Sequence, residues 1–256
     1  MNSFCAAKYL NWSVYGVPAF ETNYIWFIVN SATQRTIVVD PGCFKTVQRF
    51  VQAEKLLITD VLITHHHQDH IGGLQQLLQD KTVSSPHLQI IGTTSGRIEH
   101  ITTPVQHQQT VVLNELSIVV YEVPGHTLDH LAFYIPIANQ PNWLFCGDTL
   151  FSAGCGRIFE STHEQMFNSL KMLSHLPDNT FVFCAHEYTV SNLEFLAHYE
   201  PTNLEVINQL SLAKQLRDNQ QSTIPSLIVD EKRFNLFFRA ESVETFTKLR
   251  KSKDIY

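Results

Sequence analysis

Four histidines and an aspartate fall within six positions of this sequence, and His65, His67, Asp69 and His70 among them form the pattern H-x-H-x-D-H. Imidazole nitrogens and carboxylate oxygens packed this closely suit Zn²⁺, iron or Mn²⁺. A lone histidine beside a strand is ordinarily structural, but four donors at this spacing indicate a metal site. They follow the apolar, β-branched run 56–63, which is typical of a buried strand. We therefore expect the cluster in the loop at the C-terminal end of a strand, where α/β sheets carry their sites.

Three further donors, His126, Asp148 and His186, each stand within three residues of the end of an apolar run. Each is weak evidence alone, since an aspartate after a strand is more often a cap or a turn residue. Together with the first cluster they give four strand-end loops that offer His or Asp. This pattern predicts a dinuclear site, in which a carboxylate is the usual bridge between two metal ions.

The first two-thirds of the chain alternate between short β-branched or aromatic runs and segments with helical periodicity. Such an order of elements predicts a layered α/β domain. A capping box formed by Ser161 and Glu164 is expected to begin one of the helices. The expected strands are 23–30, 36–39, 56–64, 88–92, 116–123, 130–135, 143–148 and 180–184, and the expected helices are 44–55, 71–80 and 162–176.

The character of the sequence changes just after His186. Beyond this point helical patterns dominate, and a second capping box, Ser191 with Glu194, is expected to begin the first of them. A helical region of about 70 residues buries little surface alone, so it is expected to pack on the preceding domain. We predict a catalytic domain over 1–187 and a helical substrate-binding domain over 188–256. The expected helices are 191–199, 203–219 and 241–251, with one short strand at 226–229.

Composition places the chain among ordinary globular proteins, with 44% hydrophobic and 16% charged residues over 256 positions. No apolar run approaches the roughly 20 residues of a membrane span, and the N-terminus does not resemble a signal peptide. The five cysteines are scattered and form no C-x-x-C pair, which favours a reducing compartment. We therefore expect a cytoplasmic protein without a membrane partner.

Charge is distributed unevenly along the chain. Residues 214–256 contain nine basic and six acidic residues, a local charge of +3 against a net charge of −6 for the whole chain. A basic C-terminal region on an acidic body favours an anionic ligand. Nucleic acid is not expected as a partner, because the chain lacks a long basic run and lacks aromatic residues interleaved with basic ones.

The motif His65–His70, with Gly125-His126, Asp148 and His186, resembles the metallo-β-lactamase superfamily along the whole first domain. Further motifs are similar to those of the glyoxalase II family, the hydroxyacylglutathione hydrolases, and cover both domains. The resemblance implies an α/β fold, the four-layer αββα metallo-β-lactamase-like sandwich with a small C-terminal helical domain. The further motifs are Cys146-Gly147-Asp148-Thr149-Leu150-Phe151, Gly154-Cys155-Gly156-Arg157, His186-Glu187-Tyr188-Thr189 and Leu249-Arg250-Lys251-Ser252-Lys253-Asp254.

The resemblance also implies the ligand set of two divalent metal ions, for which we expect zinc, with iron or manganese as alternatives. By that resemblance one metal is held by His65, His67 and His126, the other by Asp69, His70 and His186, and Asp148 bridges the two. Asp69 and Asp148 are counted as catalytic for this reason. Asp40 and Thr64 are predicted to orient ligand imidazoles. The other histidines, His130 among them, are expected to be ordinary surface or core residues.

For this family the implied substrate is S-D-lactoylglutathione, which is hydrolysed to D-lactate and glutathione in the second step of methylglyoxal detoxification. A metal-bound hydroxide would attack the thioester carbonyl, since metals lower the pKa of bound water to about 7. Some family members have a tyrosine where this chain has Phe159, which removes one hydroxyl. We expect a monomer whose partner is this small thioester. The residues expected to bind the glutathione moiety are Arg157, Tyr188, Arg250 and Lys253.

Three alternatives are open at this point. The first is an iron persulfide dioxygenase of the same superfamily, which would use a single iron. The second is another hydrolase of this fold, such as a lactonase or a β-lactamase. The third is a non-catalytic metal-binding module, although structural zinc sites are closed four-ligand sites. The complete ligand set and the pair Arg250 and Lys253 favour the glutathione thioester hydrolase.

Overall fold

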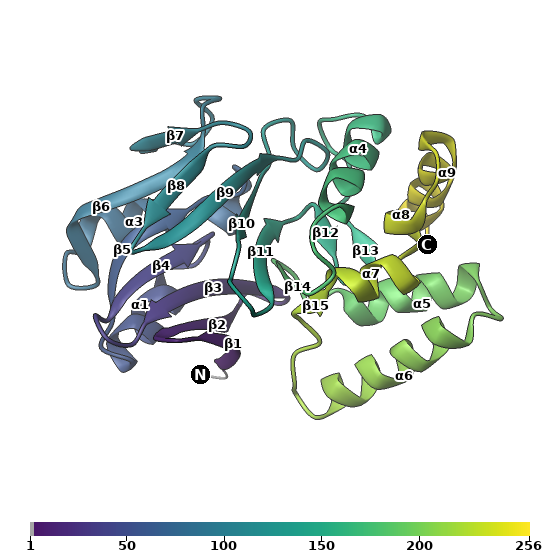
Figure 1. The fold of residues 1–256 in the computed structure, drawn as a ribbon, viewed down its shortest axis with the longest axis horizontal. Helices are drawn as coiled ribbons and strands as arrows, with labels where there is room; N and C mark the ends of the chain where they lie inside the picture. Colours follow the sequence, from purple (N-terminus) through teal and green to yellow (C-terminus); the bar gives the residue numbers. More distant parts are fainter. Residues whose placement is uncertain (1–2) are drawn as a thin grey trace. The chain divides into compact units, whose positions relative to one another are not determined.

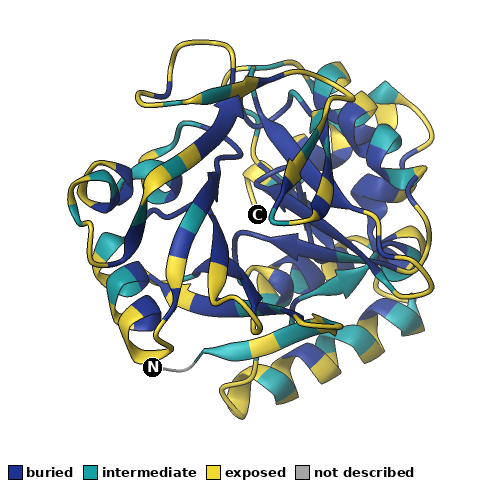
Figure 2. Cartoon of the chain, turned by 60° about the vertical axis from the view of Figure 1, so that its left-hand side comes forward, coloured by how far each residue is buried: buried dark blue, intermediate teal, exposed yellow. Residues whose placement is uncertain are grey.

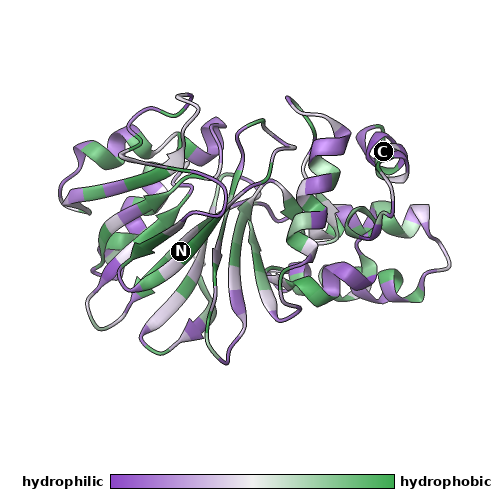
Figure 3. Cartoon of the chain, turned by 45° about the horizontal axis from the view of Figure 1, so that its top comes forward, coloured by the Kyte–Doolittle hydropathy of each residue, from purple (hydrophilic) through white to green (hydrophobic). Residues whose placement is uncertain are grey.

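The structure is a computed structural model that describes residues 3–256, and the chain groups into two compact units (Figure 1). The first unit comprises Met1–Glu122 and Leu131–Gln140, and the second comprises Val123–His130 and Pro141–Tyr256. The strands carry mainly hydrophobic residues (Figure 3), and most of their residues are buried (Figure 2). The predicted division into a catalytic domain over 1–187 and a substrate-binding domain over 188–256 stays a prediction, because it concerns the function of each part as well as its contacts.

Within the described residues, the first unit holds a seven-stranded sheet in the order β1-β2-β3-β4-β5-β6-β7. Its first four strands pair antiparallel and its last four pair parallel. β3 is buried along its whole length, as expected for a central strand with both faces covered. The strands are β1 (Phe4–Tyr9), β2 (Trp12–Ala19), β3 (Asn23–Asn30), β4 (Arg35–Val39), β5 (Leu57–Leu62), β6 (Ser84–Thr93) and β7 (Thr103–Val105).

The parallel pairing of β4 and β5 brings two loops together. Val39 lies opposite Leu62 in the register, so both strands end at the same edge of the sheet. Asp40, directly after β4, therefore lies beside Thr64, two residues after β5. The first donor cluster comes immediately after Thr64 in the chain.

Helices cover this sheet on the side of its apolar cluster. α1 (Phe44–Ala53) buries Val47, Phe50 and Val51, and the Phe50 ring lies 4.6 Å from that of Phe27 on β3. The helix predicted over 71–80 is instead two short helices, α2 (Gln68–Ile71) and α3 (Leu74–Gln79). Glycine in the helix interior is unfavourable, and Gly72-Gly73 separate the two.

The first unit also contains a three-stranded antiparallel ladder. β8 (Thr110–Leu113) pairs with β9 (Leu116–Glu122), which pairs with β10 (Leu131–Ile135). Asn114 and Glu115 both have positive φ, which is the conformation that a two-residue hairpin turn requires. The loop between β9 and β10 carries His126 and belongs to the second unit.

In the second unit, β11 (Asn142–Gly147) and β14 (Thr180–Cys184) run parallel, and β15 (Ser226–Leu227) pairs antiparallel with β14. Gly147 lies opposite Cys184 in the register. The residues that directly follow β11 and β14 therefore lie next to each other at the same end of the two strands. A small hairpin, β12 (Leu150–Phe151) with β13 (Gly154–Cys155), follows β11 almost at once.

The rest of the second unit is helical. Its aromatic core includes the stacked rings of Phe195 and Phe237. Among the described residues, no helix is both long and apolar enough to cross a membrane. The helices are α4 (His163–Ser174), α5 (Thr189–Tyr199), α6 (Leu204–Asp218), α7 (Ile228–Phe234), α8 (Leu236–Arg239) and α9 (Val243–Asp254).

Both predicted capping boxes are wrong in their residues. α4 begins with a capping box one position later, in which Thr162 accepts from Gln165 N and the Gln165 side chain accepts from Thr162 N. α5 begins before Ser191, whose hydroxyl instead donates to Tyr188 O. The helix expected at 203–219 is confirmed, with Asn203 as its N-cap. α7 and α8 follow β15 where the sequence pattern predicted only a strand.

Candidate metal centre

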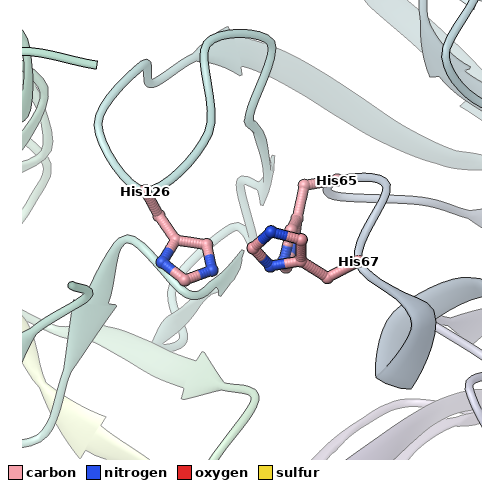
Figure 4. Close-up of side chains that lie close together, drawn as sticks. All are labelled: His65, His67 and His126. Atoms are coloured by element: carbon pink, nitrogen blue, oxygen red, sulfur yellow. The ribbon is translucent and has the colours of Figure 1, made fainter. Parts of the chain in front are cut away.

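The first donor group lies in the loop after β5. The chain is extended through His67 and then turns into the short helix α2, which carries Asp69 and His70. His65 Nε2 lies 3.1 Å from His67 Nδ1, and His70 Nε2 lies 3.5 Å from Asp69 Oδ2. Figure 4 shows the His65 and His67 rings on this loop, and His126 on its own loop. The predicted donors of this segment therefore lie close together in two pairs, His65 with His67 and Asp69 with His70.

Asp40 and Thr64 hold two of these imidazoles, as predicted. Asp40 accepts hydrogen bonds from Thr64 N at 2.8 Å, from Thr64 Oγ1 at 2.7 Å and from His70 Nδ1 at 2.9 Å. Because the Thr64 hydroxyl donates to Asp40, it accepts from His65 Nδ1, 3.0 Å away. Both imidazoles therefore carry their proton on Nδ1 and present Nε2 as the metal-binding nitrogen.

The backbone of α2 is fixed by close packing. A Cβ on Gly42 would lie 1.7 Å from Asp69 O, so only glycine lets the loop after β4 pass this close to α2. Asn23, at the start of β3, donates to Asp69 Oδ2 at 2.9 Å. Asp69 is thus held through both its backbone and its carboxylate.

The second donor group lies where β11 and β14 end. Asp148 follows β11, His186 follows β14, and Ala185 N donates to Gly147 O at 3.1 Å between them. Asp148 Oδ1 lies 3.4 Å from His186 Nε2, and Asp148 Oδ2 lies 3.4 Å from His126 Nε2. Each carboxylate oxygen therefore faces one imidazole, which is the arrangement that a bridging carboxylate needs.

His126 and Asp148 are held by further hydrogen bonds. His126 Nδ1 donates to Arg157 O at 2.7 Å, so Nε2 is its metal-binding nitrogen. Asp148 N donates to Nε2 of His130 at 3.1 Å, and Nδ1 of His130 donates to Thr149 Oγ1 at 3.2 Å. His130 is fully buried. Sequence reasoning assigned His130 no role, although it stands in the same loop as His126.

The separations fit a metal ion. Two ligands about 2.0–2.2 Å from a tetrahedral zinc ion are roughly 3.4 Å apart. The distances of 3.4 Å within the second group and 3.5 Å within the first match this value. Neutral imidazoles beside carboxylates are also the donor types that divalent zinc, iron and manganese accept. The histidine and aspartate cluster can therefore bind a divalent metal.

Two of the expected substrate residues lie against α5. Tyr188 is its N-cap residue, and the Tyr188 ring stacks on that of His186, 4.7 Å away between centroids. Lys253 donates to Ser191 O at 2.8 Å. Burial, and after it the neighbouring charge of Arg250, lowers the pKa of Lys253 to about 8.

The two arginines meet at Asp254. Arg157 follows the β12–β13 hairpin and is exposed, with Nε 3.5 Å from Asp254 Oδ1. Arg250 is only 4% exposed, and a terminal nitrogen lies 3.0 Å from the same oxygen. Its other terminal nitrogen donates to Cys155 O at 3.1 Å. Arg250 thus fixes part of the backbone, a role that the sequence pattern did not indicate.

Family models match the chain in two adjoining segments. Residues 20–186 match the metallo-beta-lactamase superfamily, and residues 187–256 match the hydroxyacylglutathione hydrolase C-terminus. A protein named hydroxyacylglutathione hydrolase from Prochlorococcus marinus is 41% identical over 249 residues, which cover 95% of this chain and 96% of the relative. One of the same name from Aliivibrio fischeri is 42% identical over 258 residues, covering 94% and 98%.

Solved structures give the same fold. The crystal structure of ETHE1 from Myxococcus xanthus has a TM-score of 0.67 at 24% identity, covering 93% of this chain and 89% of that one. A metallo-beta-lactamase from Staphylococcus aureus has a TM-score of 0.64 at 21% identity, covering 91% and 67%. These similarities concern the fold alone and confirm the predicted metallo-β-lactamase fold. Because of the two family models and these full-length relatives, the chain belongs to the hydroxyacylglutathione hydrolase family of the metallo-β-lactamase superfamily.

Proposed function

We propose that the two donor groups together form one dinuclear centre. His65, His67 and His126 would hold one divalent ion, Asp69, His70 and His186 would hold the other, and Asp148 would be the ligand that both share. The observation that carries this proposal is that each oxygen of Asp148 faces a different imidazole. The superfamily match supports it, because residues 20–186 contain all seven ligands. Zinc is the proposed metal, with iron and manganese as alternatives.

The proposed reaction is hydrolysis of S-D-lactoylglutathione, a hydroxyacylglutathione, to D-lactate and glutathione, and the name hydroxyacylglutathione hydrolase of the curated relatives supports it. Bound divalent ions supply an activated water near neutral pH and polarise the thioester carbonyl. The chain's own residues orient the ligands: Asp40 and Thr64 fix the tautomers of His70 and His65, and His130 holds the Asp148 backbone.

The proposed glutathione-binding residues are Arg157, Tyr188, Arg250 and Lys253, and residues 188–256 form the proposed substrate-binding domain. Its match to the hydroxyacylglutathione hydrolase C-terminus supports this role. Arg157, Arg250 and Lys253 provide positive charge for the glutathione carboxylates. Phe159 is exposed, and its ring lies 5.2 Å from that of His126 in an edge contact. It offers the substrate apolar contact in place of a hydroxyl.

Neither alternative reaction is favoured. A persulfide dioxygenase or another hydrolase of this fold does not account for the match over 187–256. The protein is proposed to act as a cytoplasmic monomer.

The decisive experiment uses the purified full chain with S-D-lactoylglutathione, followed at the thioester absorbance, with metal analysis of the same sample. Asp148→Asn keeps the size of the bridging residue but removes its charge. We expect a loss of bound metal and a fall in kcat/KM of at least about 100-fold. Asp178→Asn is the matched control, since the Asp178 side chain is 64% exposed and its carboxylate pairs only with Lys232 among the contacts described.

Two outcomes would contradict the proposal. The first is an Asp148→Asn variant with two metal ions per chain and normal turnover. The second is a metal-loaded wild-type protein that leaves the thioester intact but consumes oxygen with a glutathione persulfide.

A further inference from the structure

The hairpin β12–β13 is an unusual piece of backbone within the second unit. It spans Leu150–Cys155, has two residues in each strand, and is buried throughout. A hairpin of this length satisfies few of its own backbone groups, and buried backbone groups need partners. Side chains from the C-terminal helices provide them.

Four side chains from the three helices α5, α7 and α9 and from the residue between α7 and α8 bond to this backbone. Asn192 of α5 donates to Ser152 O at 3.0 Å, and Arg250 of α9 donates to Cys155 O at 3.1 Å. Glu231 of α7 accepts from Ala153 N at 3.0 Å. Asn235, between α7 and α8, donates to Gly154 O at 3.0 Å and to Phe151 O at 3.3 Å.

Glu231 and Asn235 act as one unit. Asn235 Nδ2 also donates to Glu231 Oε2 at 2.8 Å, while Asn235 Oδ1 accepts from Phe237 N and Phe238 N and so caps α8. Both residues are 0% exposed. A buried carboxylate is costly unless it is hydrogen-bonded, so this pair constrains its partners strongly.

Both ends of the hairpin lead to the metal ligands. Asp148 stands two residues before it, and a Cβ on Gly156, directly after it, would lie 1.9 Å from Asp148 O. The next residue, Arg157, provides the carbonyl that accepts from His126 Nδ1. A shift of the hairpin would therefore move Asp148 and release His126 from its hydrogen bond.

We propose that Glu231 and Asn235 are positioning residues that hold the β12–β13 hairpin and, through it, Asp148 and His126. This inference rests on the proposed function, in which these two residues are metal ligands. It assigns the helical region a part in building the metal centre as well as in binding substrate.

The test compares Asn235→Ser with Asn203→Ser in the full chain. Serine retains the N-cap at either position but removes the amide donor. Asn203 caps α6 in the same way and donates only to Glu200 among its described contacts, so it is the matched control. We expect Asn235→Ser to lower zinc affinity, measured by competition with a chromogenic chelator, by about 10-fold or more, the lower end of the loss that follows removal of a direct partner of a metal ligand. Asn203→Ser should leave zinc affinity unchanged.

A second pair of variants tests Glu231. Glu231→Gln keeps an oxygen that accepts from Ala153 N and Asn235 Nδ2, whereas Glu231→Leu removes it. We expect the glutamine variant to retain zinc affinity and kcat, and the leucine variant to lose both by about 10-fold or more.

Zinc affinity is read without substrate, so the two proposals can fail separately. A wild-type protein that binds zinc but spares the glutathione thioester overturns only the reaction. Asn235→Ser and Glu231→Leu variants that fold and bind zinc like the wild type overturn the positioning role. If Asn235→Ser does not fold, the comparison of Glu231→Leu with Glu231→Gln decides.

Discussion

The backbone N–H of Asp148 donates a hydrogen bond to Nε2 of the fully buried His130, 3.1 Å away. The other ring nitrogen of His130 donates to the Thr149 hydroxyl, so its tautomer is determined. This contact fixes the backbone of Asp148, whose two carboxylate oxygens face two different imidazoles.

His130 is therefore expected to control metal binding without being a ligand. His130→Leu leaves a buried N–H without an acceptor, which costs about 1–3 kcal/mol and frees the Asp148 backbone to move. We expect zinc affinity to fall by about 10-fold or more, whereas His130→Gln, which retains an acceptor, should keep most of it. Equal zinc affinities in the two variants, measured by chelator competition, would show that the contact has no such role.

A second prediction concerns Asp40, which accepts three hydrogen bonds and orients the imidazole of His70. Asp40→Asn turns one of these acceptors into a donor that faces another donor. We expect zinc affinity to fall by about 10- to 100-fold. Asp60→Asn is the matched control, because Asp60 is also buried in the first unit and bonds to Thr59 and Asn114 instead. A similar loss of zinc in both variants would attribute the effect to general destabilisation.

The sequence predicted well those features that depend on the order of residue types within a short segment. The strands at 23–30 and 180–184 are confirmed to the residue, because their β-branched and aromatic runs are largely buried. The parallel strands β11 and β14 then place Asp148 beside His186 through strand register alone. Donors that follow buried strands can therefore be recognised from the order of residues along the chain.

Other features could not be predicted, because they depend on contacts between distant segments. Asn235 bonds to residues more than 80 positions away, and the sequence around it shows no periodicity that would indicate this. The capping box of α4 lies one position later than predicted because Ser161-x-x-Glu164 and Thr162-x-x-Gln165 are equally good patterns.

Glu231 gives a prediction about stability and pH. Burial raises the pKa of Glu231 from 4.5 to about 7, so between these values the folded state holds a proton that the unfolded state has lost. The free energy of unfolding of the wild type therefore falls as pH rises from about 4.5 to 7, and ionisation of Glu231 lowers it by about 3 kcal/mol in all. The glutamine side chain does not ionise. The free energy of unfolding of Glu231→Gln, measured with urea, should therefore rise relative to that of the wild type by about 2–3 kcal/mol between pH 5 and pH 8.

The control for this variant is Glu244→Gln on the exposed face of α9. Lys248 lowers the pKa of Glu244, so Glu244→Gln should not become more stable relative to the wild type as pH rises. A stability difference between Glu231→Gln and wild type that does not change from pH 5 to pH 8 would mean that Glu231 titrates normally in the folded protein.

Lys253 gives a prediction about substrate binding and pH. Burial and the nearby Arg250 guanidinium lower its pKa to about 8, so Lys253 loses its charge as pH rises through that value. The pH dependence of kcat/KM reports the free enzyme, and a charge-assisted contact is worth about 1.5–3 kcal/mol. We therefore expect kcat/KM for S-D-lactoylglutathione to fall by about tenfold or more above pH 8.

Lys253→Arg keeps its charge at every accessible pH, so in this variant the fall in kcat/KM above pH 8 should disappear. A thioester without the glutathione carboxylates should also lack this fall in the wild type. If Lys253→Arg shows the same fall above pH 8, the titrating group is another one and Lys253 does not bind the substrate through its charge.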